Sequence, residues 1–108
     1  MGEFLHIDEA NFDQEVLKAE KPVLLEFGAT WCAPCKQLEP ELLRLGSEWA
    51  DKVRLAKLDV DESSNLTMKF GVMSVPTVIL FVNGEAKQRL TGFQSRQRIA
   101  EKMGMFIK

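Results

Sequence analysis

Short apolar segments alternate with amphipathic segments along this chain, and this alternation limits the folds that it can adopt. Runs of apolar and β-branched residues predict strands, whereas apolar residues at every third or fourth position predict helices. The predicted strands cover residues 4–7, 23–29, 53–60, 77–82 and 86–90. The predicted helices cover the segment around Phe12, Val16 and Leu17, then residues 34–49, 63–70 and 94–106. Because strands and helices alternate early and two strands follow one another late, we expect an α/β fold with a mixed sheet and helices on both its faces.

Local signals predict how several of these elements begin, end or bend. Asp8 and Asn11 are suitable caps for the first helix, and Lys21-Pro22 is expected to end it. Pro40 lies inside the second helix and should kink it, because proline lacks the N–H that a helical residue donates. Asn83-Gly84 is a strong signal for a hairpin between the last two strands. Three residues of the last helix are predicted to face the core: Ile99, Met103 and Phe106.

The size and charge of the chain exclude several classes of protein. A length of 108 residues fits a single domain, 1–108, because two domains would each be near the lower size limit for an independent core. The 14 basic and 16 acidic residues give a formal net charge of −2, which argues against nucleic acid as a partner. The longest clearly apolar stretch, residues 78–82, is far shorter than the ~20 residues of a membrane-spanning helix. Nothing in the sequence requires an oligomer, so we expect a monomer without membrane contact.

The first residues predict a cytoplasmic protein. No basic segment follows Met1, and Asp8 and Glu9 interrupt any apolar core of a secretory signal. Gly2 does not predict myristoylation, because His6 stands where serine or threonine is expected. We therefore expect the cytosol as the default compartment.

The two cysteines, Cys32 and Cys35, follow a predicted strand and begin a predicted helix. Pro34 suits the first helical turn, where a missing N–H costs nothing. Residues three apart on a helix have neighbouring side chains, so the two sulfurs can form a disulfide with little backbone movement. The free N–H groups and the positive end of the helix dipole would stabilise a thiolate at Cys32, the attacking form of a cysteine. Cys35 lies one turn further and is expected to be more buried and to resolve a mixed disulfide made by Cys32.

Three other roles for this pair remain open. A zinc site would need two more ligands, and the chain has one histidine, His6, and no third cysteine. Two inert buried thiols would not need the start of a helix, a position that activates a cysteine. A structural disulfide between residues so close in sequence would close a very short loop and would constrain the unfolded chain little. Redox chemistry is therefore the leading interpretation.

The segment Trp31-Cys32-Ala33-Pro34-Cys35-Lys36 resembles the active-site motif of the thioredoxin family. The resemblance covers essentially the whole chain. It includes further residues at matching positions: Phe12, Phe27, Ala29, Pro40, Lys57, Asp59, Asp61, Phe70-Gly71, Val75-Pro76-Thr77, Asn83-Gly84 and Gly92. The resemblance implies a three-layer α/β/α fold with a mixed five-stranded sheet flanked by four helices. It also implies a thiol–disulfide oxidoreductase that reduces disulfide bonds in protein substrates.

The same resemblance implies partners and a surface that contacts substrates. Electrons would come from NADPH through a flavin-containing thioredoxin reductase, or from a related donor, with no cofactor bound to the chain itself. Cys32 would be the nucleophile and Cys35 the resolving cysteine. The surface that contacts substrates would consist of Trp31, Ala33, Pro34, Val75, Pro76 and Gly92.

Three positions of that surface also have simpler explanations. Trp31 could be a packed core residue, because large aromatic side chains are usually buried. Pro76 resembles a cis-proline of the family, with the backbone of Val75 offering an edge to an extended substrate, whereas a trans proline at the start of a strand is the common arrangement. Gly92 could be a turn glycine rather than a place where a partner approaches closely.

Glu26 interrupts the apolar strand at residues 23–29, where a carboxylate is costly to bury. The family usually has aspartate here, beneath the disulfide, where it accepts a proton from the resolving cysteine. Burial would raise the pKa of Glu26 and make it a usable acid and base near neutral pH. Lys57, on the neighbouring strand, is expected to pair with Glu26 and to oppose that rise. The alternative is a glutamate on a solvated face of the strand.

Three residues depart from the family pattern. Ala33 replaces the usual glycine between the cysteines, which favours helix and changes how the redox potential is tuned. Gly28 replaces an aromatic residue, so we expect less apolar mass near the cysteines and a looser site or a groove there. Phe93 is larger than the residue usual beside Gly92 and would reshape substrate docking.

The main alternative function is a redox-independent binding or chaperone module that uses the same surface. A Cys35→Ser variant distinguishes the two functions, because a redox carrier would trap mixed disulfides and lose turnover whereas a module would form unaltered complexes. A disulfide oxidant or isomerase is a third possibility. Ala33-Pro34 and the expected cytosolic compartment favour a reductant over it.

Overall fold

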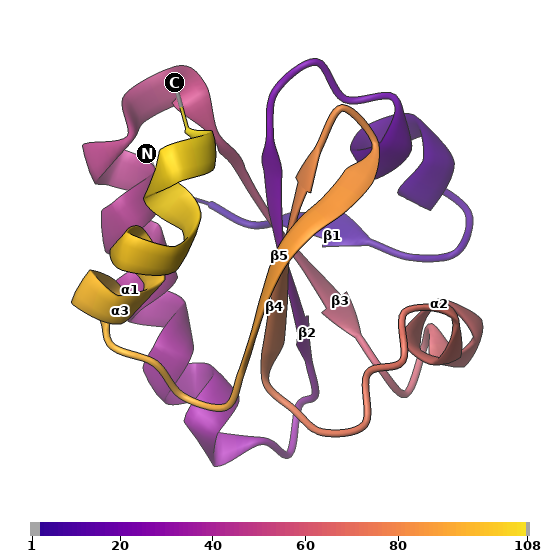
Figure 1. The fold of residues 1–108 in the computed structure, drawn as a ribbon. Coiled ribbons are helices and arrows are strands. Elements are labelled where there is room, and N and C mark those ends of the chain that lie inside the picture. Colours follow the sequence, from indigo (N-terminus) through magenta and orange to yellow (C-terminus); the bar gives the residue numbers. More distant parts are fainter. Residues whose placement is uncertain (1–2, 108) are drawn as a thin grey trace.

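The computed structural model describes residues 3–107, so Gly2 and the expectation about its myristoylation lie outside the described residues. Five strands form one mixed sheet in the order β1-β3-β2-β4-β5 (Figure 1). The strands are β1 (Leu5–Ile7), β2 (Val23–Gly28), β3 (Arg54–Asp59), β4 (Thr77–Val82) and β5 (Glu85–Thr91). The first three are mutually parallel, β4 is antiparallel to β2, and β5 is antiparallel to β4.

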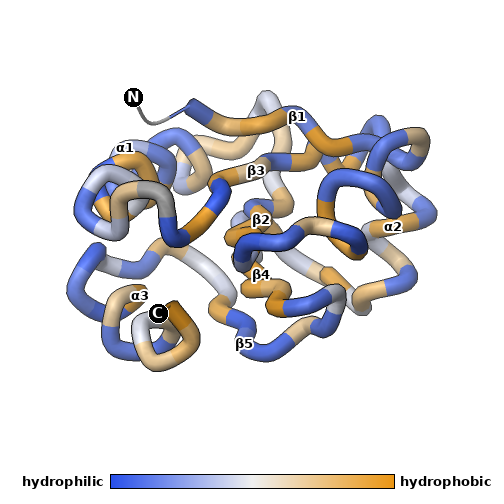
Figure 2. Tube along the Cα trace, turned by 90° about the horizontal axis from the view of Figure 1, so that it is seen from above, coloured by the Kyte–Doolittle hydropathy of each residue, from blue (hydrophilic) through white to orange (hydrophobic). Residues whose placement is uncertain are grey.

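Helices cover both faces of this sheet, as Figure 2 shows from above. The helices are the π-type η1 (Asp13–Leu17), α1 (Ala33–Glu48), α2 (Ser64–Lys69) and α3 (Arg96–Met103), with short 3₁₀ turns η2 (Ala50–Lys52) and η3 (Gly104–Phe106). The helices α1 and α3 pack on one face, and η1 and α2 pack on the other. The predicted α/β fold, with a mixed five-stranded sheet between two helical layers, is therefore confirmed. None of the helices formed by residues 3–107 is long and apolar enough to cross a membrane.

Two apolar cores hold the three layers together, because successive residues of a strand point to opposite faces of the sheet. The core beneath η1 and α2 includes Phe12, Val16, Leu25, Phe27, Leu58, Leu66, Ile79 and Phe81. The core beneath α1 and α3 includes Leu24, Leu38, Leu42, Leu45, Leu55, Val78, Leu80, Ile99 and Met103. The second core supports α1, the helix that begins at the cysteines.

The hairpin predicted at Asn83-Gly84 is confirmed. Asn83 has a φ of 53° and Gly84 a φ of 79°, the left-handed conformation that a two-residue hairpin turn requires at both positions. A Cβ atom on Gly84 would lie 2.7 Å from the carbonyl oxygen of Leu17 at the end of η1. The turn therefore needs a glycine for its backbone conformation and also for its close approach to η1.

Some local predictions differ from the structure. The first helix is a short π-type segment, and Asp8 and Asn11 exchange side chain–backbone hydrogen bonds of 2.8 and 3.0 Å just before it. Phe106 packs on the second core but is only partly buried, because the chain passes from α3 into a 3₁₀ turn after Met103. The helix α1 runs from residue 33 to residue 48 with Pro40 inside it, and the kink expected there stays a prediction.

Candidate active site

The cysteine pair lies at the junction predicted for it. The strand β2 ends at Gly28, and α1 begins at Ala33 with Cys32 as its N-cap and Pro34 in its first turn. Cys32 and Cys35 form a disulfide with their Cα atoms 5.3 Å apart. Cys35 is 1% exposed and Cys32 is 3% exposed, so the expected difference in burial has the predicted direction but is small. The bonded pair excludes two inert thiols.

The start of α1 provides a hydrogen-bond donor for the sulfur of Cys32. Its Sγ accepts a hydrogen bond of 3.1 Å from the backbone N–H of Cys35. This N–H is one of the unpaired donors at a helix N-terminus, where the helix dipole also favours negative charge. The same interactions would stabilise a thiolate once the disulfide opens. Within the described part of the chain, no cluster of three or more His, Cys, Asp or Glu is arranged to hold a metal, so a zinc site finds no support.

Trp31 precedes the pair and is 67% exposed, so the interpretation of Trp31 as a core residue is wrong. Its indole Nε1 donates a hydrogen bond of 2.9 Å to Oδ2 of Asp61, which lies just after β3. This bond holds the ring on the surface beside the cysteines. Ala33 and Pro34 are exposed in the same segment.

The start of β4 lies at the same end of the sheet as the cysteines. Thr77, the first residue of β4, pairs with Phe27 near the end of β2, and it also pairs with Thr91 at the end of β5. The peptide bond between Val75 and Pro76 is cis, so the trans alternative is wrong.

Gly92 follows β5 at this edge and has a φ of 82°, which by itself favours glycine. Its N–H donates a hydrogen bond of 2.7 Å to the carbonyl oxygen of Pro76. Phe93 beside it is an exposed aromatic residue. The turn explanation for Gly92 is thus sufficient, and its contact with substrates stays a prediction.

Glu26 is 1% exposed in the middle of β2, so the alternative of a solvated glutamate is wrong. Its register partners are Lys57 on β3 and Val78 on β4. Neither carboxyl oxygen has a hydrogen-bond partner among residues 3–107. A buried polar group without partners is costly, and such groups in native proteins often have a functional reason.

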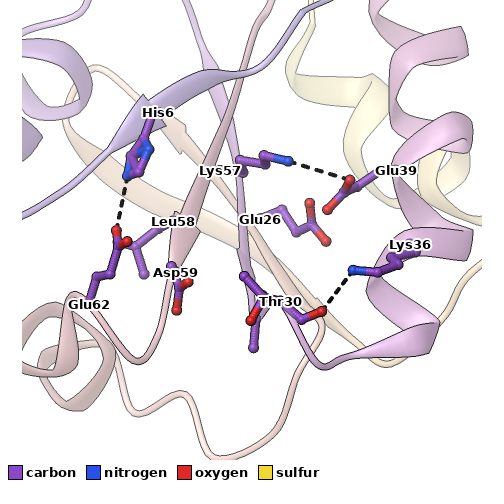
Figure 3. A pocket seen from close by; sticks show the side chains of 11 residues that line it. His6, Glu26, Thr30, Lys36, Glu39, Lys57, Leu58, Asp59 and Glu62 are labelled. Atoms are coloured by element: carbon purple, nitrogen blue, oxygen red, sulfur yellow. Dashed lines mark hydrogen bonds and ion pairs between the residues drawn. The ribbon is translucent and has the colours of Figure 1, made fainter.

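The expected pairing of Lys57 with Glu26 is wrong. Although the two residues are direct neighbours in the sheet, Nζ of Lys57 lies 3.5 Å from Oε1 of Glu39 on α1 (Figure 3). Both members of that ion pair remain partly in contact with solvent. Moving the ammonium group of Lys57 down to Glu26 would cost more desolvation, because Glu26 is fully enclosed.

The surroundings of Glu26 favour its protonated form. Burial raises the pKa of Glu26 from 4.5 to about 8. The neighbouring carboxylate of Glu39 adds to the rise in pKa, and the positive charge of Lys57 opposes it. The predicted direction of the shift is therefore confirmed, although Lys57 acts from its ion pair with Glu39.

Gly28 lies close to both this carboxyl group and Cys35, with no room for a side chain between them. A Cβ atom on Gly28 would lie 3.2 Å from Sγ of Cys35 and 3.3 Å from Oε2 of Glu26. A cavity of about 290 Å³ is lined by Gly28, Glu26, Glu39 and Lys57, among others, so a groove is present beside Gly28, and its origin in the missing aromatic side chain stays a prediction. Glu39 was not predicted from the sequence, and its only signal was that of an acidic residue one helical turn after Cys35.

Comparisons with known proteins agree with this geometry. A sequence model of the thioredoxin family matches residues 3–105. A thioredoxin of Alicyclobacillus acidocaldarius is 43% identical over 86% of this chain and 88% of its own length. A thioredoxin of Haemophilus influenzae is 37% identical over 99% of this chain and 100% of its own. An M-type chloroplastic thioredoxin of Pisum sativum is 38% identical over 94% of this chain and 59% of its own length. The fold, the disulfide at the helix start and these matches together show that the chain belongs to the thioredoxin family.

Proposed function

We propose that Cys32 is the nucleophile with which this thiol–disulfide oxidoreductase reduces disulfide bonds in proteins. The observation that carries the proposal is the hydrogen bond from the N–H of Cys35 to Sγ of Cys32 at the start of α1. Because thiolate is the attacking species, a donor and a helix N-terminus at this sulfur lower the cost of forming it. The family membership favours this redox role over a binding or chaperone module without turnover.

The reaction conserves electrons through two exchanges. The Cys32 thiolate attacks one sulfur of the substrate disulfide, so a mixed disulfide forms and the other substrate sulfur leaves as a thiolate. Cys35 then loses its proton and attacks Sγ of Cys32. This step forms the Cys32–Cys35 disulfide and releases the second substrate sulfur, and both substrate thiolates take up protons. Two electrons thus pass from the protein dithiol to the substrate.

Glu26 supports this reaction as the proton acceptor and donor for Cys35. A Cβ atom on Gly28 would lie 3.2 Å from Sγ of Cys35 and 3.3 Å from Oε2 of Glu26. The sulfur and the carboxyl group therefore lie next to the same position. A pKa of about 8 suits a group that must accept and release a proton near neutral pH. Lys57 acts on Glu26 only by opposing the rise of its pKa.

Substrates dock on the exposed surface around the disulfide. Trp31, Ala33 and Pro34 supply its exposed part next to Cys32. The backbone of Val75, before Pro76 and β4, offers an edge to an extended segment that contains the target disulfide. Gly92 leaves room at this edge, since a Cβ on it would meet no described atom within 4 Å.

The protein is re-reduced by a flavin-containing thioredoxin reductase that draws electrons from NADPH, and it binds no cofactor of its own. It acts as a monomeric domain, residues 1–108, in the cytoplasm, where it contributes to electron transfer and redox homeostasis. The family membership and the small negative net charge of −2 support this setting.

Reduction of insulin disulfides with thioredoxin reductase and NADPH tests the overall activity. The wild-type protein should turn over, and Cys32→Ser should abolish turnover. Cys35→Ser should lose turnover and accumulate a mixed disulfide with the substrate, detected as a mass increase that a reductant reverses. Complexes that form equally well in both serine variants and resist a reductant would instead support the binding module.

Glu26→Gln tests the role of the buried acid. This variant should keep the fold and reduce disulfides more slowly, because glutamine cannot accept the proton of Cys35. An unchanged rate between about pH 6 and pH 9 would remove Glu26 from the mechanism.

A further inference from the structure

Glu39 is an acidic residue of α1 that takes no part in the reaction steps described above. Its side chain is 25% exposed and lines the cavity together with Glu26 and Lys57. Figure 3 shows the carboxylates of Glu39 and Glu26 facing one another across this cavity, with the end of Lys57 turned to Glu39. Glu39 is therefore the link between an enclosed carboxyl group and the solvent-exposed mouth of the cavity.

The contacts of Lys57 leave Glu26 beside a like charge. Lys57 lies 3.5 Å from Glu39 and forms its ion pair there. No donor within the described chain bonds to the oxygens of Glu26, whereas a protonated Glu26 could hydrogen-bond to Glu39, so protonation relieves the cost of burying this carboxyl group. Two carboxyl groups that share one enclosed space do not both ionise easily, and one of them retains a proton.

We propose that Glu39 is a positioning residue that keeps Glu26 protonated in the resting protein and passes the proton between Glu26 and solvent through the cavity that both carboxyl groups line. This inference rests on the proposed role of Glu26. Glu26 first passes its own proton to the Glu39 carboxylate, which releases it to bulk water. The Glu26 carboxylate then accepts the proton of Cys35, and the Lys57–Glu39 ion pair re-forms when Glu39 is ionised again.

Other charged groups line the cavity as well. The remaining titratable groups that line it are His6 on β1, Lys36 on α1, Asp59 at the end of β3 and Glu62 in the following turn. His6 pairs with Glu62 at 3.4 Å, and Lys36 donates to the carbonyl oxygen of Thr30 at 2.8 Å. On its other side, Glu26 faces the apolar Val78 of β4. Glu39 and Lys57 are the charges that act on the pKa of Glu26.

The test follows the pH dependence of single-turnover disulfide reduction by the reduced protein, from about pH 5.5 to pH 9.5. The limb of the pH–rate profile that belongs to Glu26 is the part where the rate changes as Glu26 ionises. Glu39→Gln removes the negative charge and should shift this limb to lower pH by about one unit. Lys57→Gln removes the opposing positive charge and should shift the same limb to higher pH. Glu41→Gln makes the same charge change two residues further on α1, away from the cavity lining, and should leave the limb in place.

A Glu26→Gln variant separates the two proposals. It identifies the limb, because that limb must disappear when Glu26 cannot ionise. If the limb persists in Glu26→Gln, the proposed role of Glu26 fails. If the limb disappears in Glu26→Gln but does not move in Glu39→Gln, the role of Glu39 alone is overturned. Titration of the Glu26 carboxyl carbon by NMR gives the same shift directly, and Glu39→Ala repeats the test should Glu39→Gln not fold.

Discussion

The buried carboxyl group of Glu26 should make the stability of the oxidised protein depend on pH. Its pKa rises from 4.5 in the unfolded chain to about 8 in the folded protein. Between these values the folded state holds a proton that the unfolded state has lost. The free energy of unfolding therefore falls as the pH rises through this window and is constant above it. At about 1.4 kcal/mol per pH unit, the loss across the whole window approaches about 5 kcal/mol.

Glu26→Gln removes this loss, because glutamine is neutral at every pH. Below about pH 4.5 wild type and variant should have similar stabilities, and above about pH 8 the variant should be the more stable by several kcal/mol. Urea unfolding of both proteins in their oxidised form, from about pH 4 to pH 9, measures the difference. The oxidised form is chosen because bonded cysteines do not titrate.

Glu41→Gln is the matched control, since it makes the same charge change at a site away from the cavity lining. Its stability relative to wild type should change little across the same range. Parallel stability curves for wild type and Glu26→Gln would refute the reasoning, because they would mean that Glu26 has the same pKa in the folded and unfolded chains. A difference that grows as the pH falls would refute it too, since the sign would be opposite.

Four further substitutions test the packing of the fold and of the site. Gly84→Ala should lower the free energy of unfolding more than Gly71→Ala does. Both glycines have a positive φ, which costs alanine ~1–2 kcal/mol, but only at Gly84 would the Cβ also lie 2.7 Å from a backbone oxygen. Urea unfolding of the two variants measures the difference, and equal costs would contradict the contact. Gly28→Ala places a methyl group between Sγ of Cys35 and Oε2 of Glu26, so mixed disulfides should resolve more slowly in a stopped-flow assay, and an unchanged rate would mean that this space is unimportant. Leu42→Ala removes a fully buried side chain beneath α1 and should destabilise the protein by about 2–5 kcal/mol in denaturant titrations, and a cost below about 1 kcal/mol would contradict this packing.

Most of the fold followed from local patterns. The β-branched run at residues 77–82 became β4 with the same bounds, and Asn83-Gly84 became the hairpin turn. The first helix was harder to predict, because it is five residues long and π-type, and tertiary contacts of Val16 with the core hold it rather than its own helical propensity. Phe106 packs on the core as predicted but is only partly buried, since it lies in the 3₁₀ turn after Met103 and not in α3.

The chemistry of the cysteine pair was determined by the sequence itself. Two cysteines three residues apart at a strand-to-helix junction lie within bonding distance in any fold that forms that helix, because helical geometry is local. The environment of Glu26 was decided by the tertiary structure. The strand register makes Lys57 the neighbour of Glu26, but the partner of a long side chain depends on which groups the packed helix places near its end. Here α1 places Glu39 there. The spacing of the sheet and α1 and the cavity beside Gly28 arise only when distant segments pack, so the sequence could predict a buried acid but not the partner that controls it.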